Sequence, residues 1–120
     1  MSLYSEILAD SPRLYWRFIE SAAFPTTAAD WSGNALDGLT NSTVGGPSLN
    51  ASSSRSRTFN GTSHSAGVGD NNLLDLGDTF TLECYVRPDA AGLGTLRSLI
   101  DKGSGAYWLI LNTANQIELY

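Results

Sequence analysis

Oxygen-bearing side chains gather in the segment 30–38. Four of them lie two or three residues apart and are punctuated by glycines: Asp30, Ser32, Asn34 and Asp37. Calcium takes six to eight oxygen ligands from carboxylates, amide carbonyls and the backbone, and this segment offers several. It is not an EF-hand loop, because Ala35 stands at the sixth position and no Glu stands at the twelfth. The alternative is a pair of turns in which Asp and Asn side chains bind their own backbone, followed by a short strand that begins near Leu36.

Two carboxylates elsewhere are the candidates for hydrolysis. Glycoside hydrolysis needs a pair of carboxyl groups about 5 Å apart or somewhat more. Glu83 lies on a predicted strand, and Glu118 on another strand could face it, but Glu83 is not followed by further carboxylates. His64 is the one histidine, and the run 103–105 is not the nucleophile elbow of a serine hydrolase. We therefore expect no catalytic residues and no enzymatic activity.

The composition of the 120 residues is typical of a turn-rich β protein. Charged residues make up 16% of the chain, and its polarity comes from Ser, Thr, Asn and 12 glycines. A net charge of −5 argues against binding nucleic acid through its phosphates and against docking on an anionic membrane. The start has no basic leader followed by an apolar run, and no stretch reaches the roughly 18 apolar residues of a membrane span. We expect neither a secretory signal nor membrane insertion.

Strict alternation makes the segment 79–88 the clearest predicted strand. Its apolar face carries Phe80, Leu82, Cys84 and Val86, and its polar face carries Thr81, Glu83, Tyr85 and Arg87. Strand side chains alternate between two faces, so the apolar face needs a second layer to cover it. Cys84 is expected to be buried there as a small hydrophobic residue.

The rest of the chain predicts one short helix and many short strands. The helix is expected over 5–10, and further strands are expected over 13–18, 55–60, 63–68, 96–102, 106–111 and 116–120. Arg13, Tyr15 and Arg17 fall on the solvated face of the first strand. Asn60-Gly61 predicts a hairpin between 55–60 and 63–68. The segment 106–111 is apolar on both faces, which is typical of a central strand. This pattern indicates an all-β antiparallel sandwich or barrel, and it stops at Tyr120 as if further residues or another subunit completed the sheet.

Five short motifs resemble, in order, the laminin-G-like, concanavalin A-like jelly-roll domains of bacteriophage virion proteins. They are 4–12 with 14–17, 29–34, 58–62, 80–88 and 99–103. The second is similar to the family's A-D-x-S-G-N loop and the fourth to its F-T-L-E-x-W-V-K-P strand, whereas Asn60 in the third replaces the usual Asp. The resemblance implies an antiparallel two-sheet jelly-roll sandwich with a short N-terminal helix. It implies one domain over 1–120, truncated at its C-terminal end because the family's domains are longer.

The resemblance also implies binding rather than catalysis. Such domains bind glycans, host-surface molecules or neighbouring proteins, often with a structural Ca²⁺. The chain is therefore expected to be a non-catalytic module of a virion, in a tail fibre, a tail tip or a capsid decoration, with a lectin-like sandwich. The expected partners are other virion proteins, copies of itself and a cell-surface glycan. The candidate ligand-binding residues are Trp31, Glu83, Tyr85, Arg87 and Tyr107, and the candidate calcium ligands are Glu20, Asp30, Asn34 and Asp37.

Other interpretations remain open. Each candidate aromatic side chain could belong to the core, and Glu83 and Arg87 could form a cross-strand charge pair. A purely architectural oligomerisation domain is favoured by the strand edge expected at 116–120, since unpaired edges are normally covered. A glycoside hydrolase on the same fold is the third alternative.

Overall fold

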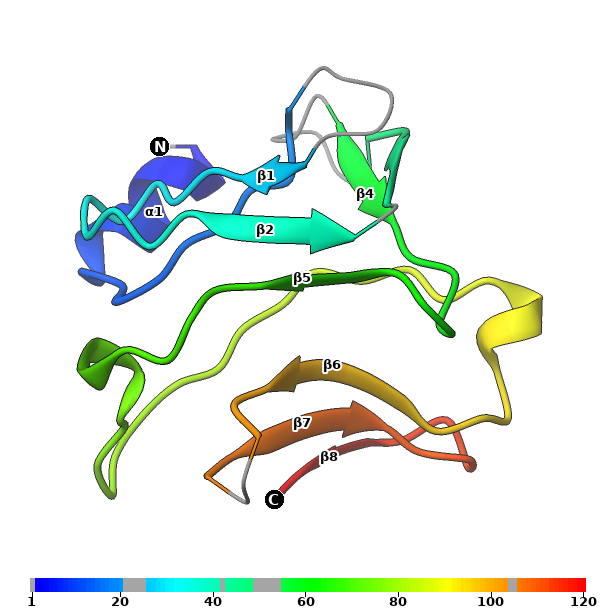
Figure 1. Cartoon of the computed structure of the whole chain (residues 1–120). Coiled ribbons are helices and arrows are strands. Elements are labelled where there is room, and N and C mark those ends of the chain that lie inside the picture. Colours follow the sequence, from blue (N-terminus) through cyan, green and yellow to red (C-terminus); the bar gives the residue numbers. More distant parts are fainter. Residues whose placement is uncertain (1, 21–25, 42, 49–54, 104–105) are drawn as a thin grey trace. The chain divides into compact units, whose positions relative to one another are not determined.

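The computed structural model describes residues 2–20, 26–41, 43–48, 55–103 and 106–120 of the chain. They form two compact units, Met1–Asn71 and Asn72–Tyr120. Short antiparallel strands predominate, with one α-helix in the first unit, so the predicted all-β class is confirmed (Figure 1). The jelly-roll sandwich and the single domain stay predictions. Among these residues no helix has the length and apolarity needed to cross a membrane.

The helix α1 (Leu3–Ala9) confirms the predicted N-terminal helix and begins two residues earlier than expected. Its start is decided by a capping box, in which the Ser2 hydroxyl accepts from the Ser5 N–H at 3.2 Å and the Ser5 hydroxyl accepts from the Ser2 N–H at 3.0 Å. It ends at Ala9 with Asp10 as its C-cap, because Ser11 turns to a φ of 53° and leaves the helical region.

The described residues of the first unit also form two small antiparallel sheets. One has the order β1 (Thr27–Ala28), β2 (Gly38–Asn41) and β5 (Ser65–Gly67), and the other pairs β3 (Val44–Gly46) with β4 (Ser56–Thr58). The strands β4 and β5 therefore belong to different sheets, and the predicted hairpin between 55–60 and 63–68 is wrong. The serine-rich segment 48–56 lies mostly outside the described residues.

The side chain of Asn60 explains why the hairpin does not form. Its Oδ1 accepts three backbone N–H groups at 2.9 to 3.0 Å, from Thr62, Ser63 and His64, and Gly61 adopts a φ of 69°. An Asn side chain that binds the following backbone competes with ladder pairing. The turn predicted at Asn60-Gly61 is present, but it delivers the chain to another sheet.

The segment 13–18 is not the strand predicted there. Its one bridge within the described part of the chain joins Trp16 to Asp30, and Phe18 leaves the extended region with a φ of 54°. Trp16 is nevertheless held firmly, because its indole Nε1 donates to the Leu36 carbonyl at 2.9 Å. Its ring lies against Gly38 of β2, so these contacts connect the segment to the sheet.

This packing predicts a large difference between two glycine variants. A Cβ added at Gly38 would lie 2.4 Å from Cζ2 of Trp16, whereas one added at Gly67 on the neighbouring strand β5 would meet nothing within 4 Å. Gly38→Ala should therefore lower the free energy of unfolding by about 1–3 kcal/mol, because overpacking displaces a rigid ring. Urea denaturation measures this, with Gly67→Ala as the matched control. Equal losses in both variants would contradict the contact.

The second unit is built on one sheet. Its strands are β6 (Arg97–Asp101), β7 (Trp108–Leu111) and β8 (Ile117–Leu119), in the order β6-β7-β8. The three predicted strands and the central position of 106–111 are thus confirmed. Two 3₁₀ turns, η1 (Asn72–Leu74) and η2 (Ala90–Gly92), precede the sheet. The run 103–105 lies partly outside the described residues.

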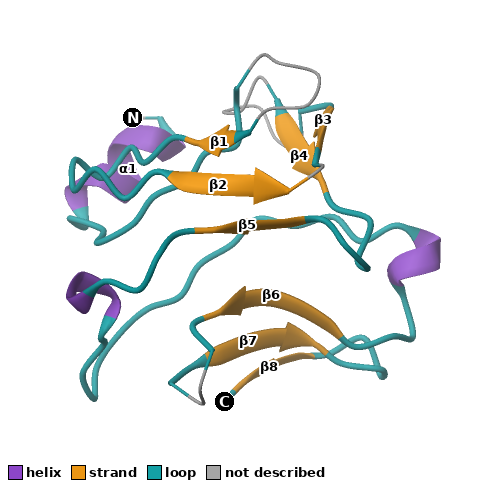
Figure 2. Cartoon of the chain, in the orientation of Figure 1, coloured by secondary structure: helices purple, strands orange, loops and turns teal. Residues whose placement is uncertain are grey.

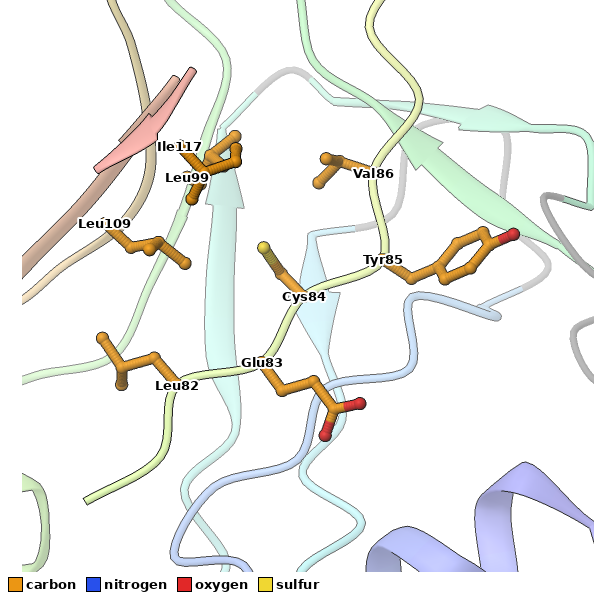
Figure 3. Close-up of a pocket in the computed structure, with 8 residues that line it drawn as sticks. All are labelled: Leu82, Glu83, Cys84, Tyr85, Val86, Leu99, Leu109 and Ile117. Atoms are coloured by element: carbon orange, nitrogen blue, oxygen red, sulfur yellow. The ribbon is translucent and has the colours of Figure 1, made fainter. Parts of the chain in front are cut away.

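The segment 79–88 is a correction to the sequence interpretation. It runs as loop between η1 and η2 and is not part of a sheet (Figure 2). Its alternation is nevertheless real: Leu82, Cys84 and Val86 point to one side, and Glu83 and Tyr85 point to the other (Figure 3). The alternation of apolar and polar residues therefore indicated correctly which side chains share a side. It did not indicate whether the backbone pairs with another strand.

Candidate functional site

The predicted calcium ligands lie in a tightly hydrogen-bonded loop of the first unit. The Asp30 carboxylate accepts backbone N–H groups of Tyr15 at 3.0 Å, Ser32 at 2.9 Å and Leu36 at 2.9 Å, and the Ser32 hydroxyl at 2.7 Å. Burial raises the pKa of Asp30, but these four hydrogen bonds outweigh it and leave the pKa below its ordinary value of 3.8. Asp30 therefore organises the loop as a carboxylate held by the chain itself. The alternative of Asp turns is confirmed.

The other three candidates also contact the chain directly. Asp37 accepts the Asp30 N–H at 2.8 Å, and the Asn34 amide donates to the Arg13 carbonyl at 3.0 Å. Glu20 accepts the Ala29 N–H at 2.8 Å with one oxygen and pairs with Arg57 through the other. Within the described ranges no group of three or more His, Cys, Asp or Glu side chains is arranged to hold a metal ion. Calcium binding stays a prediction.

Trp31 lies beside this loop in a cluster of aromatic side chains around Arg17. The guanidinium carbon of Arg17 lies 4.5 Å from the centroid of the Tyr4 ring and 4.9 Å from that of the Trp31 ring. The two rings meet edge to face at 5.8 Å, and Tyr15 stacks on Tyr4 at 6.2 Å. We call Tyr4, Tyr15, Arg17 and Trp31 the Arg17 cluster. Trp31 is its most open member, with 39% of its surface exposed.

Three separate segments position the Arg17 cluster. Tyr4 comes from α1, Tyr15 and Arg17 from the segment 13–18, and Trp31 from the loop that Asp30 organises. The Trp31 N–H donates to the Tyr15 carbonyl at 2.9 Å, which fixes the loop to that segment. Sequence reasoning found Trp31 and assigned Tyr15 and Arg17 to a solvated face. It did not find Tyr4, because helix packing brings that ring to the site.

The polar face of the segment 79–88 is open to solvent. Glu83, Tyr85 and Arg87 are all exposed, and Tyr85 keeps 64% of its surface. Glu83 and Tyr85 point away from the apolar side chains in Figure 3. The structure therefore keeps these three candidates accessible, but it presents them on a loop rather than on a strand of a sheet.

Tyr107 is not an accessible ligand-binding residue, in contrast to the sequence-based expectation. It is buried, its hydroxyl donates to the Leu74 carbonyl at 3.3 Å and its ring lies 5.9 Å from that of Phe80. Burial raises the pKa of its hydroxyl, the nearby charge of Lys102 opposes that rise, and the charge of Asp75 adds to it. The interpretation of Tyr107 as a core residue is the correct one.

A second aromatic surface lies on the sheet of the second unit. The Trp108 ring lies 6.0 Å from that of Tyr120, and its indole donates to the Ser98 hydroxyl at 3.0 Å. The two oxygens of Glu118 accept from Tyr120 at 2.8 Å and from Asn112 at 2.6 Å, and the first of these bonds raises the pKa of Tyr120. Sequence reasoning did not select Trp108 as a candidate. Side chains alternate along an extended chain, so Trp108 lies on the opposite face from its neighbour Tyr107.

An apolar groove of about 390 Å³ separates the segment 82–86 from the sheet of the second unit. Its apolar lining consists of Leu82, Cys84, Val86, Leu99, Leu109 and Ile117 (Figure 3). Cys84 is exposed rather than buried as predicted, although its thiol points into the groove. Desolvation by these apolar neighbours and the charge of Glu83 raise the pKa of that thiol. A thiol with a raised pKa is less ionised at neutral pH, so these surroundings do not activate Cys84 as a nucleophile.

Comparison with protein-family models, with curated proteins and with solved structures finds no match to this chain. The resemblance to laminin-G-like domains therefore stays a prediction.

Proposed function

We propose that this chain is a non-catalytic carbohydrate-binding module and that the Arg17 cluster is its glycan site. The observation that carries this proposal is the partly exposed ring of Trp31, which packs against Tyr4 and Arg17. Of the aromatic candidates, Trp31 alone combines an open surface with a charged, hydrogen-bonding neighbour. Tyr85 is more exposed, but among the described residues no Arg or Lys lies over its ring, and Tyr107 is buried.

The chemistry of the cluster fits a sugar. A sugar ring has an apolar C–H face, which stacks on an aromatic ring, and a rim of hydroxyl groups, which need hydrogen-bond partners. Trp31 supplies the first surface, and the guanidinium of Arg17 supplies donors next to it. An aromatic side chain loses little conformational freedom on binding, and the Asp30 hydrogen bonds hold the loop before the ligand arrives.

The sequence motifs suggest the particle to which the module belongs. Their resemblance to virion domains supports a bacteriophage particle, with the module in a tail fibre, a tail tip or a capsid decoration. There it would attach the particle to a cell-surface glycan within a jelly-roll sandwich, with other virion proteins or its own copies as neighbours. A structural calcium ion remains part of the proposal for the loop 30–37.

A glycan array probed with the full chain, in calcium and in EDTA, tests the proposal. We expect binding to at least one glycan, and we expect Trp31→Ala to weaken it at least tenfold. Trp108→Ala and Tyr85→Ala are the matched controls, because each removes an aromatic side chain from another surface. Circular dichroism checks that the variants fold. Absence of binding to any glycan, or equal binding by Trp31→Ala, would overturn the proposal.

A purely architectural role is the second candidate, and the strand β8 favours it. As the last strand of the order β6-β7-β8, it has an outer edge that pairs with no strand of the described chain. Ile117 and Leu119 are 56% and 53% exposed on it. Edges of this kind pair with other chains. Sedimentation of the full chain and of Leu119→Lys tests this role: a monomer at every concentration would exclude self-assembly through β8.

A further inference from the structure

We infer that the ligand of the Arg17 cluster is an acidic glycan, with Arg17 binding a carboxylate attached to the sugar ring. This inference rests on the proposed carbohydrate-binding function. It adds the chemical class of the ligand, because the charge state and surroundings of Arg17 distinguish an acidic sugar from a neutral one.

The position of Arg17 leaves its hydrogen-bond donors available. The guanidinium lies in the corner between Tyr4 and Trp31, whose rings are perpendicular at 90°. The faces of aromatic rings attract the positive charge, but they supply no oxygen acceptors for the N–H groups. Arg17 forms no hydrogen bond with any residue that the structure describes. The five N–H donors of the guanidinium are therefore unused by the residues that the structure describes.

Arg17 has no carboxylate partner among the described residues, although the protein is acidic. The chain has 12 Asp and Glu residues against 7 Lys and Arg residues. Arg57 pairs with Glu20, and Lys102 pairs with Asp75. In contrast, no carboxylate of the described residues pairs with Arg17, and the residues outside that part include no Asp or Glu. Arg17 is half-buried, and a charge in such a place is costly unless it is paired.

A uronic acid would satisfy both parts of the site. Its carboxylate matches the planar fork of the guanidinium, which binds carboxylates through two parallel hydrogen bonds. Because that carboxylate is bonded to the sugar ring, a sugar that contacts Trp31 on the side where Arg17 lies would bring it near the guanidinium, whose carbon is 4.9 Å from the indole centroid. A neutral sugar would stack on Trp31 equally well but would leave the charge of Arg17 unpaired.

An array of paired oligosaccharides tests the inference with the full chain. The acidic members are oligogalacturonate, hyaluronan fragments and oligosialic acid, each printed beside its carboxyl-reduced counterpart and beside sulfated dextran. We expect at least one acidic member to bind at least tenfold more tightly than its reduced counterpart. Arg17→Gln should abolish that preference while binding to the reduced sugar remains. Arg55→Gln, which removes an exposed arginine of the same unit, should keep the preference.

The outcomes separate the inference from the proposed function. Equal binding of acidic and reduced sugars, with Trp31→Ala still weakening both, would overturn the inference and leave carbohydrate binding in place. Tighter binding of sulfated dextran than of every carboxylate would overturn the choice of a carboxylate. Binding of none of these sugars would overturn the acidic ligand, and binding of no glycan on the wider array would overturn the function as well. Arg17→Lys keeps the charge but loses the fork, so an intermediate preference in a folded Arg17→Lys variant would support bidentate binding.

Discussion

Glu20→Ala should lower the free energy of unfolding by about 3–5 kcal/mol, which is the cost of removing one partner of a buried ion pair. The side chain of Arg57 is 1% exposed, and Glu20 is its carboxylate partner. The hydroxyl groups of Thr43 and Thr40 also accept from Arg57, at 2.9 and 3.3 Å, but they are neutral and cannot balance its charge. The substitution would therefore remove the Glu20 carboxylate from a buried guanidinium and from the Ala29 N–H.

Urea denaturation of three variants measures this effect. Glu20→Ala should be much less stable than the wild-type chain, and the double variant Glu20→Ala/Arg57→Met should recover part of the loss, because no charge then remains buried. Glu6→Ala, which removes an exposed carboxylate from α1, is the control. A loss in Glu20→Ala no larger than in Glu6→Ala would contradict the role of the pair.

Asp30→Ala should lower the free energy of unfolding by about 3 kcal/mol, because it removes the acceptor of four hydrogen bonds at once. A buried donor left without a partner costs about 1–3 kcal/mol, and the N–H groups of Tyr15 and Leu36 would both lose theirs. Ser32 would lose its contacts as well, and the Trp31 loop would loosen. Urea denaturation gives the magnitude. Retention of full stability would show that water replaces the carboxylate at no cost.

The lowered pKa of Asp30 adds a pH dependence with a definite sign. A carboxyl group whose pKa is lower in the folded chain than its ordinary value of 3.8 stabilises the fold above that value. This contribution is lost as the pH falls through the folded pKa, since the proton then bound removes the charge that the four donors stabilise. The wild-type chain should therefore lose more stability on acidification than Asp30→Asn. Parallel losses in the two proteins would contradict this.

The same variant decides the calcium prediction. A ligand that binds only the folded chain raises its melting temperature. If calcium binds at Asp30, calcium should raise the melting temperature of the wild-type chain, EDTA should reverse this, and Asp30→Asn should respond less. If the hydrogen bonds of the loop are the whole role of Asp30, melting temperatures in calcium and EDTA should coincide.

Features that depend on neighbouring residues were predictable from the sequence. The helix α1, the strands β6, β7 and β8, and the turns at Asp30 and Asn60 follow from capping, alternation and short polar side chains, each of which acts over a few positions. The alternation of the segment 79–88 also correctly indicated which side chains face the apolar groove. All of this information is contained in stretches of about ten residues.

Features that depend on distant partners were decided only by the tertiary structure. Alternation could not show that 79–88 remains outside a sheet, or that β4 pairs with β3 and β5 with β2, because a partner strand is a non-local choice. The same holds for the Arg17 cluster. Trp31 was a candidate by its type alone, but a helix, an extended segment and a loop had to pack together before it acquired Tyr4 and a cation beside it. The sequence thus determined the residue types and the local turns, and packing between distant segments determined the site.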